Sequence, residues 1–312
     1  PPPYTPATII LTPREATRRM PGRNGLRFGE LARDITAESF QLRLPQNHNP
    51  AAAAGLLVWI SPMASGTPPR ALHDAADELN FIIIGADNSG NDRPPIDRMQ
   101  LALDAAATAS ARYHIDESRI YAVGMSGGGR MASVMWCNAP DVFTAAIGIV
   151  GLYSPHMVRA PDGRMGMTND WPARDFRKMI GDHPIAGIGG PPDFNHDEMV
   201  ERIRQLTADG YSAKMFSHAD MAHTMPTPQR FKEALLFVDA PWQARRAAAL
   251  PLAEKLLAAY IAEHGETPPP DEAAAAALEH ITAVAPWSPP AAAAARLLGY
   301  AMDSALDPRP AR

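Results

Sequence analysis

Short apolar runs alternate with helical patterns between residues 39 and 240, and this alternation restricts the folds open to the chain. Continuous apolar runs of this length are typical of strands that are buried on both faces of a parallel sheet. The runs are GLLVWIS (55–61), NFIIIGA (80–86), RIYAVG (119–124), FTAAIGIVG (143–151), HPIAGIGG (183–190) and SAKMFSH (212–218). Helical spacing occurs at 72–80, 98–114, 196–210 and 228–239. The alternating segment SFQLRLP (39–45) predicts an additional, exposed strand. The sequence therefore predicts an α/β fold with a mostly parallel central sheet and helices on both faces.

Three regions of the chain differ in composition. Residues 1–38 are rich in Pro and Arg and predict an N-terminal arm with the first edge elements. Residues 39–242 form the predicted α/β domain. Residues 243–312 are rich in Ala, are interrupted by TPPP and WSPP, and predict a helical extension. That extension either packs on the α/β domain or forms a separate interaction module.

The overall composition excludes several classes of protein. A net charge of −5 at pH 7 and a pI near 6.1 give no reason to expect nucleic-acid binding. No apolar run approaches the roughly 18 residues that a membrane-spanning helix needs. Cys137 is the only cysteine, so intramolecular disulfides are excluded, and its apolar neighbours predict a buried structural thiol. The first residue is Pro1 rather than Met, so we expect a processed or trimmed chain from which any export signal would already be gone.

A glycine-rich segment at the end of the run 119–124 carries a serine. Gly124-Met125-Ser126-Gly127-Gly128 fits G-x-S-x-G, in which the serine lies on a sharp turn between a strand and a helix. The dinucleotide-binding pattern fails at Ser126, and the phosphate-binding pattern fails because no lysine follows the glycines. A nucleophilic serine fits this pattern best, with the backbone N–H of Gly127 facing the reacting carbonyl. The alternative is a tight glycine-rich turn whose serine has no chemical role.

A serine nucleophile needs a histidine base, and in this fold the chain order is serine, acid, histidine. His223 lies in the loop after the last predicted strand, at the sheet edge where Ser126 is also expected, and is the predicted base. His218, at the end of that strand, is the next candidate. His196 begins a helix, and His183 precedes a strand at the opposite edge.

The acid that orients the histidine is expected after the preceding strand. Asp193 lies there, in a loop of Gly and Pro residues, and is the predicted acid. Asp197 falls inside the next helix, where it favours the helix N-terminus. Asp220 is close to His223 in sequence, but proximity within one loop does not by itself provide the contact with the imidazole.

Taken together, VGMSGGGRMAS, PPDFN and AHTMP resemble the serine, acid and histidine segments of α/β-hydrolase esterases. The resemblance is to the polyhydroxybutyrate-depolymerase-like and feruloyl-esterase-like group, and it covers roughly residues 39–240. It implies the α/β-hydrolase fold and a serine esterase that cleaves carboxylic esters with no cofactor. Together with the start at Pro1, it favours a secreted or periplasmic location and leaves a cytoplasmic one open. By motif, it also implies a catalytic triad of Ser126, Asp193 and His223, with Gly127 as one oxyanion donor.

One departure from this resemblance concerns the oxyanion hole. After the strand that corresponds to GLLVWI, such enzymes usually have His-Gly, and the backbone N–H that follows completes the hole. This chain has Ser61-Pro62 instead, and proline has no N–H to donate. The second donor is therefore expected from Met63 or Ala64. We expect one of these N–H groups to point at the same space as the N–H of Gly127.

Two further segments are expected to face the site. Residues 152–182 lie where such hydrolases place lid and pocket segments. The candidates for an acyl or aromatic pocket are Tyr153, Met157, Met165, Met167 and Trp171, and ordinary packing is their alternative role. DNSGND (87–92) resembles a calcium loop faintly, but its sixth and twelfth positions are Asp92 and Arg98 instead of Gly and Glu. We therefore expect a turn facing the site and no metal.

The sequence thus predicts a serine hydrolase that acts on an ester substrate, either a small molecule or a polymer. A peptidase or an acyltransferase on the same triad is the alternative among enzymes. A hydrolase-fold binding protein without catalysis is the alternative outside enzymes, because the segment at Ser61-Pro62 departs from the pattern. The acyl group, the alcohol group and the oligomeric state are not predicted.

Overall fold

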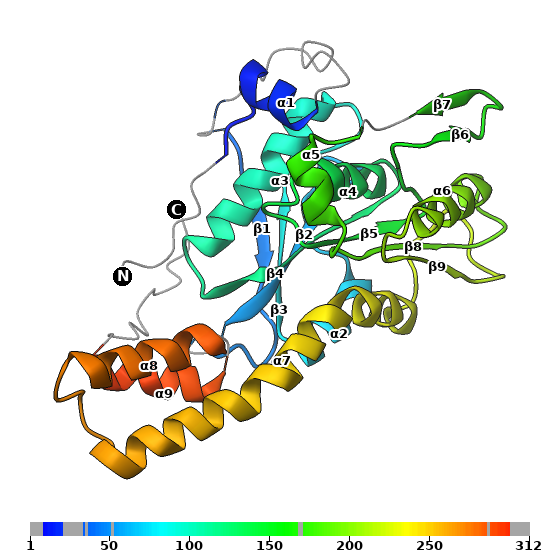
Figure 1. The fold of residues 1–312 in the computed structure, drawn as a ribbon. Helices are drawn as coiled ribbons and strands as arrows, with labels where there is room; N and C mark the ends of the chain where they lie inside the picture. The colour runs from blue at the N-terminus through cyan, green and yellow to red at the C-terminus, as the bar shows by residue number, and fades with distance from the viewer. Residues whose placement is uncertain are drawn as a thin grey trace.

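A seven-stranded sheet forms the centre of the computed structural model, which describes residues 9–20, 34, 37–50, 53–167, 171–285 and 288–299 (Figure 1). Its strand order is β1-β3-β2-β4-β5-β8-β9. The strands are β1 (Phe40–Arg43), β2 (Ala54–Ile60), β3 (Phe81–Ala86), β4 (Ile115–Met125), β5 (Ala145–Ile149), β8 (Ile185–Gly189) and β9 (Ala213–Ser217). Only β1 pairs antiparallel within this sheet. A separate antiparallel pair consists of β6 (Met157–Arg159) and β7 (Met165–Met167).

Helices cover both faces of the sheet. They are α1 (Pro13–Arg19), α2 (His73–Leu79), α3 (Pro95–Ser110), α4 (Gly127–Asn138), α5 (Arg174–Ile180), α6 (His196–Ala208), α7 (Pro228–His264), α8 (Glu272–Val284) and α9 (Pro289–Leu297). Successive strand residues point to opposite faces, so Leu56 and Leu57 of β2 belong to two different cores. Leu56 lies in the core with Trp136 of α4, and Leu57 lies in the core with Phe231 of α7. Burial of both faces explains why the strands read as continuous apolar runs.

The sheet order and the position of Ser126 identify the α/β-hydrolase fold. Ser126 follows the central strand β4, and Asp193 and His223 follow β8 and β9. The strands β4, β8 and β9 are parallel members of one sheet, so their carboxyl ends lie at the same edge. The predicted fold is confirmed.

The N-terminal region contains a helix that the sequence did not predict. The Thr12 side chain accepts a hydrogen bond from the N–H of Glu15, and Pro13 stands in the first turn, so α1 begins where Pro-rich composition suggested an irregular arm. Arg19 of α1 is buried and donates two hydrogen bonds of 2.7 Å to the carboxylate of Asp141. The described part of the arm is therefore packed on the α/β domain.

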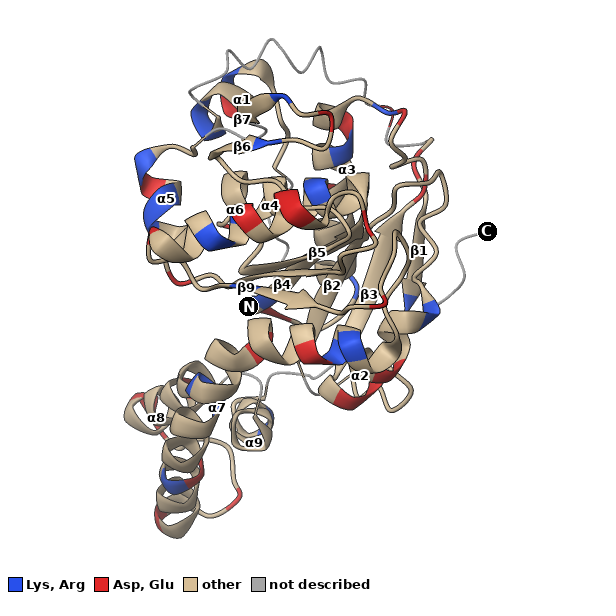
Figure 2. Ribbon diagram, turned by 90° about the vertical axis from the view of Figure 1, so that its right-hand side faces the viewer, with Lys and Arg blue, Asp and Glu red and all other residues tan. Residues whose placement is uncertain are grey.

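The last sheet helix continues into the C-terminal region. The sequence predicted a helix ending at residue 239 and a boundary at 243, but α7 runs without interruption to His264, through Pro241 and Pro251. α8 and α9 pack on its outer half around Tyr260, and Figure 2 shows few charged residues on these two helices. Within the described residues, no helix combines the length and the apolar character needed to cross a membrane.

A buried polar cluster attaches α7 to the sheet. The carboxylate of Asp239, on α7, accepts hydrogen bonds of 2.7 Å from Arg119 and Tyr121 of β4 and from Gln243. The Arg119 guanidinium also lies 3.9 Å from the ring centroid of Trp242. Burial beside Asp239 raises the pKa of the Tyr121 hydroxyl, so this group stays a donor at all relevant pH values.

We predict that Asp239→Ala lowers the free energy of unfolding by about 3–5 kcal/mol, because it leaves the buried Arg119 charge without a partner. Lys232→Ala is the matched control on the same helix, since Lys232 pairs with Glu78 at the surface. We expect that control to cost less than about 1 kcal/mol. Urea unfolding followed by fluorescence measures both values. Equal losses for the two variants would contradict a structural role of the buried cluster.

Candidate active site

Ser126 lies on a strained turn between β4 and α4. Its φ of 53° and ψ of −120° are unusual for a residue other than glycine. The Ser126 N–H donates to the carbonyl of Ile149 at 2.7 Å, which holds the turn against β5. The turn needs Gly128, because a Cβ there would lie 1.9 Å from the carbonyl oxygen of Ile60. The strain therefore persists because backbone from β2 and β5 packs directly against the turn.

The structure brings Ser126, His223 and Asp193 together. His223 Nε2 lies 2.9 Å from Ser126 Oγ, and His223 Nδ1 lies 2.7 Å from Asp193 Oδ1. The Asp193 side chain is fully buried, whereas the His223 side chain is 28% exposed. The aromatic ring of Phe194 stacks on the imidazole with centroids 4.5 Å apart and covers one of its faces. This arrangement can move a proton from the serine to the histidine while the carboxylate holds the imidazole tautomer.

The other histidine candidates have different surroundings. His196 Nε2 lies 2.8 Å from the hydroxyl of Ser217. Burial lowers the pKa of His218, and its Nε2 has no hydrogen-bond partner among the described residues. The His183 carbonyl accepts a hydrogen bond from the Trp136 indole. None of these contacts involves Ser126.

The alternative acids also have other partners. Asp197 is fully exposed and lies beside His196. Asp220 pairs with Arg230 at 2.7 Å, and this contact lowers the pKa of its carboxyl group. Neither carboxylate is hydrogen-bonded to His223.

The expected oxyanion donors differ in their availability. The Met63 N–H donates to the Ser61 hydroxyl at 3.0 Å, so it is already engaged within its own loop. No hydrogen bond between described residues uses the N–H of Gly127 or Ala64. The loop after β2 thus offers Ala64 more readily than Met63.

Hydrogen bonds join the loop after β2 to the loop 87–92. The Asn91 N–H donates to the Pro62 carbonyl at 3.0 Å, and the Asn88 N–H donates to the Ala64 carbonyl at 2.5 Å. The Gly66 N–H donates to the Asp87 carboxylate at 2.8 Å. DNSGND therefore forms a turn beside the loop after β2. Among the residues that the structure describes, no group of His, Cys, Asp or Glu is arranged to hold a metal ion.

A buried arginine is hydrogen-bonded to both the loop after β2 and the loop 87–92. Arg98 of α3 is 5% exposed and donates to the carbonyl oxygens of Ser89, at 2.6 Å, and Ser61, at 3.2 Å. Burial lowers the pKa of its guanidinium to about 10. No carboxylate of the described ranges lies within salt-bridge distance of it. Its charge is therefore stabilised mainly by backbone dipoles of the two loops.

A second polar network, which the sequence did not predict, joins α4 to the loops after β5 and β8. Arg130 donates to Asn195 Oδ1 at 2.8 Å and to the Tyr153 hydroxyl at 3.1 Å. The Asn195 carboxamide in turn donates to the Val150 carbonyl at 2.9 Å, and Val150 has a positive φ of 44°. The sequence signal for this network is Arg130, a charged residue in the first helical turn after the serine.

The predicted pocket residues differ in their contacts and in their exposure. The Tyr153 hydroxyl belongs to the Arg130 network. Met157 is 55% exposed on β6, as is Met165 on β7, and the side chain of Met167 lies outside the described residues. Trp171 contacts the rings of His156 and Tyr211. Their contact with a substrate remains a prediction.

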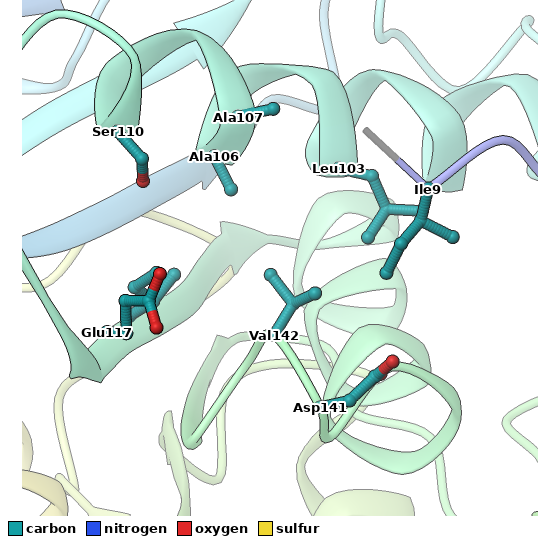
Figure 3. A pocket seen from close by; sticks show the side chains of 9 residues that line it. Ile9, Leu103, Ala106, Ala107, Ser110, Glu117, Asp141 and Val142 are labelled. Carbon is teal, nitrogen blue, oxygen red and sulfur yellow. The ribbon is translucent and has the colours of Figure 1, made fainter. Parts of the chain in front are cut away.

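A cavity of about 100 Å³ lies away from Ser126 (Figure 3). Its lining includes Ile9, Leu103, Ser110, Glu117 and Val142. Glu117 stands near the start of β4, whereas Ser126 follows the end of the same strand. The cavity is therefore at the opposite end of β4 from the candidate site.

Comparisons with known proteins place the serine turn within a hydrolase family model. A model of the prolyl oligopeptidase family matches residues 97–172. No curated protein matched the sequence. Among solved structures, a ferulic acid esterase is 18% identical with a TM-score of 0.48, covering 64% of this chain and 89% of its own. Est1E from Butyrivibrio proteoclasticus with ferulic acid bound is 16% identical with a TM-score of 0.45, covering 64% and 92%. An arylesterase is 13% identical with a TM-score of 0.46, covering 64% and 79%.

The similar solved structures include a ferulic acid esterase, a name that also occurs in the group that the sequence motifs resemble. Each of these likenesses has a TM-score below 0.5. The assignment of the fold therefore rests on the sheet order and on the serine turn of this chain itself.

We predict that Arg98→Met loosens the two loops without unfolding the protein. A hydrogen bond from a charged group stabilises by about 1.5–3 kcal/mol, so protection of the Gly66, Asn88 and Asn91 amides should fall roughly tenfold or more. Hydrogen exchange measured at single-residue resolution tests this. Arg112→Met is the control, because Arg112 is exposed just beyond the same helix. Unchanged protection in Arg98→Met would show that the guanidinium does not hold the loops.

Proposed function

We propose that this protein is a carboxylic ester hydrolase that works through an acyl-enzyme on Ser126. The observation that carries the proposal is the continuous chain of hydrogen bonds from Ser126 Oγ through His223 to the buried Asp193. Serine hydroxyls become nucleophilic when a positioned base accepts their proton. The strained backbone at Ser126 further supports a functional role, because such strain concentrates at active sites.

The proposed reaction has two halves. Ser126 Oγ attacks the ester carbonyl carbon while its proton passes to His223 Nε2, and Asp193 stabilises the imidazolium that forms. The tetrahedral intermediate then expels the alcohol, which takes the proton from His223. Water, deprotonated by the same imidazole, next attacks the acyl-enzyme. The carboxylic acid leaves as Ser126 Oγ takes the proton back from His223. The N–H of Gly127 and a donor from Met63 or Ala64 would stabilise the oxyanion in both halves.

Apolar surface near the site supports a substrate with an apolar group. Phe194, which stacks on the imidazole, is 65% exposed. Met63, in the proposed oxyanion loop, is 69% exposed. Such large exposed side chains beside a nucleophile favour an ester whose acyl or alcohol part is apolar.

A peptidase is the second candidate, because the matching family model is that of the prolyl oligopeptidases and includes the serine turn. Esters and amides use the same triad chemistry, so a matched pair of ester and amide substrates with one acyl group separates the two functions. Labelling of Ser126 by a fluorophosphonate separates either enzyme from a non-catalytic binding protein.

We predict that Ser126→Ala removes at least about 10³ of ester turnover while the fold is retained, because no other described group is placed to form the acyl-enzyme. Hydrolysis of short-chain p-nitrophenyl esters measures the rate, and circular dichroism checks the fold. Turnover that survives in a clean Ser126→Ala preparation would refute the proposed nucleophile.

The orienting acid gives a separate prediction. Asp193→Asn should lower kcat by about 10⁴, because an asparagine favours the wrong imidazole tautomer. Asp197→Asn and Asp220→Asn should stay within about twofold of the wild type, since their carboxylates contact His196 and Arg230 instead. Steady-state kinetics of the three variants on one ester decides the assignment. If Asp220→Asn were the most damaging change, the acid would be misassigned.

A further inference from the structure

The side chain of Asn91 lies directly beside the backbone that follows Ser126. A Cβ built on Gly127 would lie 2.0 Å from Asn91 Oδ1 and 2.9 Å from Asn91 Nδ2. The Asn91 carboxamide therefore packs on the Cα of Gly127, whose N–H is the first proposed oxyanion donor. Glycine at this position makes the close approach of the carboxamide possible.

Asn91 is exposed, and its carboxamide has no hydrogen bond to any residue that the structure describes. A carboxamide offers two N–H donors and one acceptor oxygen. Rotation of the carboxamide by 180° exchanges its N and O atoms. The two orientations have nearly the same shape, so hydrogen-bond partners decide between them. A developing negative charge at this place would select the orientation that presents Nδ2.

The backbone of Asn91 is held in place although its side chain is exposed. Its N–H donates to the Pro62 carbonyl at 3.0 Å, and Arg98 supports the same loop through Ser89. At the neighbouring position, a Cβ on Gly90 would lie 3.1 Å from the carbonyl carbon of Met63. The loop 87–92 is thus packed on the loop after β2, and a fixed backbone presents the carboxamide to the site.

Of the backbone donors expected from the loop after β2, only the N–H of Ala64 is unused among the described residues. Pro62 has no N–H, and the N–H of Met63 is bonded to the Ser61 hydroxyl. An oxyanion hole needs preorganised donors about 2.7–3.1 Å from the developing charge. Asn91 is the uncommitted side-chain donor that the described residues place against Gly127.

We infer that Asn91 Nδ2 donates a hydrogen bond to the oxyanion alongside the backbone donors, in the place of the N–H of Met63, which is bonded within its own loop. This inference rests on the proposed ester hydrolysis at Ser126. It makes Asn91 a catalytic residue, because its amide touches the reacting oxygen. If Asn91 only packed against Gly127, the reaction rate would not depend on the hydrogen-bonding groups of its side chain.

Replacement of Asn91 tests the inference directly. Asn91→Ala should lower kcat by about 10²–10³ with a much smaller change in KM, because an oxyanion donor acts mainly in the transition state. Asn91→Asp should be at least as damaging, since a carboxylate repels the oxyanion. Affinity for a trifluoromethyl ketone, which binds as a hemiketal oxyanion, should fall by a similar factor. Asp92→Ala, the adjacent exposed residue of the same loop, is the control and should stay within about twofold.

Gly127→Ala supplies an independent second measurement. Its methyl group would occupy the place of the Asn91 carboxamide and displace it. Gly127→Ala and Asn91→Ala should therefore each lower kcat, and the double variant should be little worse than either single one. Losses that multiply in the double variant would contradict a shared mechanism.

The outcomes separate this inference from the proposed function. If the wild type cleaves esters and Ser126→Ala does not, but Asn91→Ala keeps kcat within twofold, Asn91 is not an oxyanion donor. If the wild type neither cleaves esters nor reacts with a fluorophosphonate, the proposed function is wrong and this inference is wrong with it. Thermal unfolding of each variant distinguishes lost chemistry from lost folding.

Discussion

The sheet edge that carries the candidate active site depends on the positive φ of a single serine. Ser126 adopts a φ of 53°, and this turn aims its hydroxyl at His223 rather than into the sheet. The conformation is costly for a residue with a side chain, typically about 1–3 kcal/mol, so surrounding structure must enforce it. The bond from the Ser126 N–H to the Ile149 carbonyl, and the close approach of Ile60 to Gly128, supply that enforcement. Any change that separates β2 or β5 from the turn therefore acts on the proposed nucleophile.

Ser61-Pro62, which stands where the esterases that the sequence resembles have His-Gly, has a structural role in the folded protein. Pro62 has lost an N–H donor, but its carbonyl accepts the N–H of Asn91 and so joins the two loops at the site. Arg98 reinforces the same junction with its buried guanidinium. Burial of a charge is costly unless the group is hydrogen-bonded, and the guanidinium is bonded to the carbonyls of Ser61 and Ser89. This part of the site is built from loop-to-loop contacts and not from one strand end alone.

The C-terminal region is connected to the same sheet by one continuous helix. Asp239 binds Arg119 and Tyr121 of β4, and β4 is the strand that ends at Ser126. α7 continues from this anchor through Pro241 and Pro251, although proline removes a helical hydrogen bond and usually kinks or breaks a helix. The extension is therefore a continuation of a helix of the α/β domain, and α8 and α9 gain their apolar contacts from its outer half (Figure 1).

The sequence by itself determined the α/β class, the strand positions to within a few residues, and the segments that carry Ser126, Asp193 and His223. Burial of both strand faces produces continuous apolar runs, and the serine turn requires small residues at fixed spacing, so both leave local traces in the chain. The end of α7 was predicted wrongly, because tertiary contacts at Asp239 and Trp242 override the local effect of proline. The place of Asn91 and the role of Arg98 were decided only by the tertiary structure. Their partners are carbonyls and backbone atoms of distant loops, which any residue can supply, and so no sequence pattern records them.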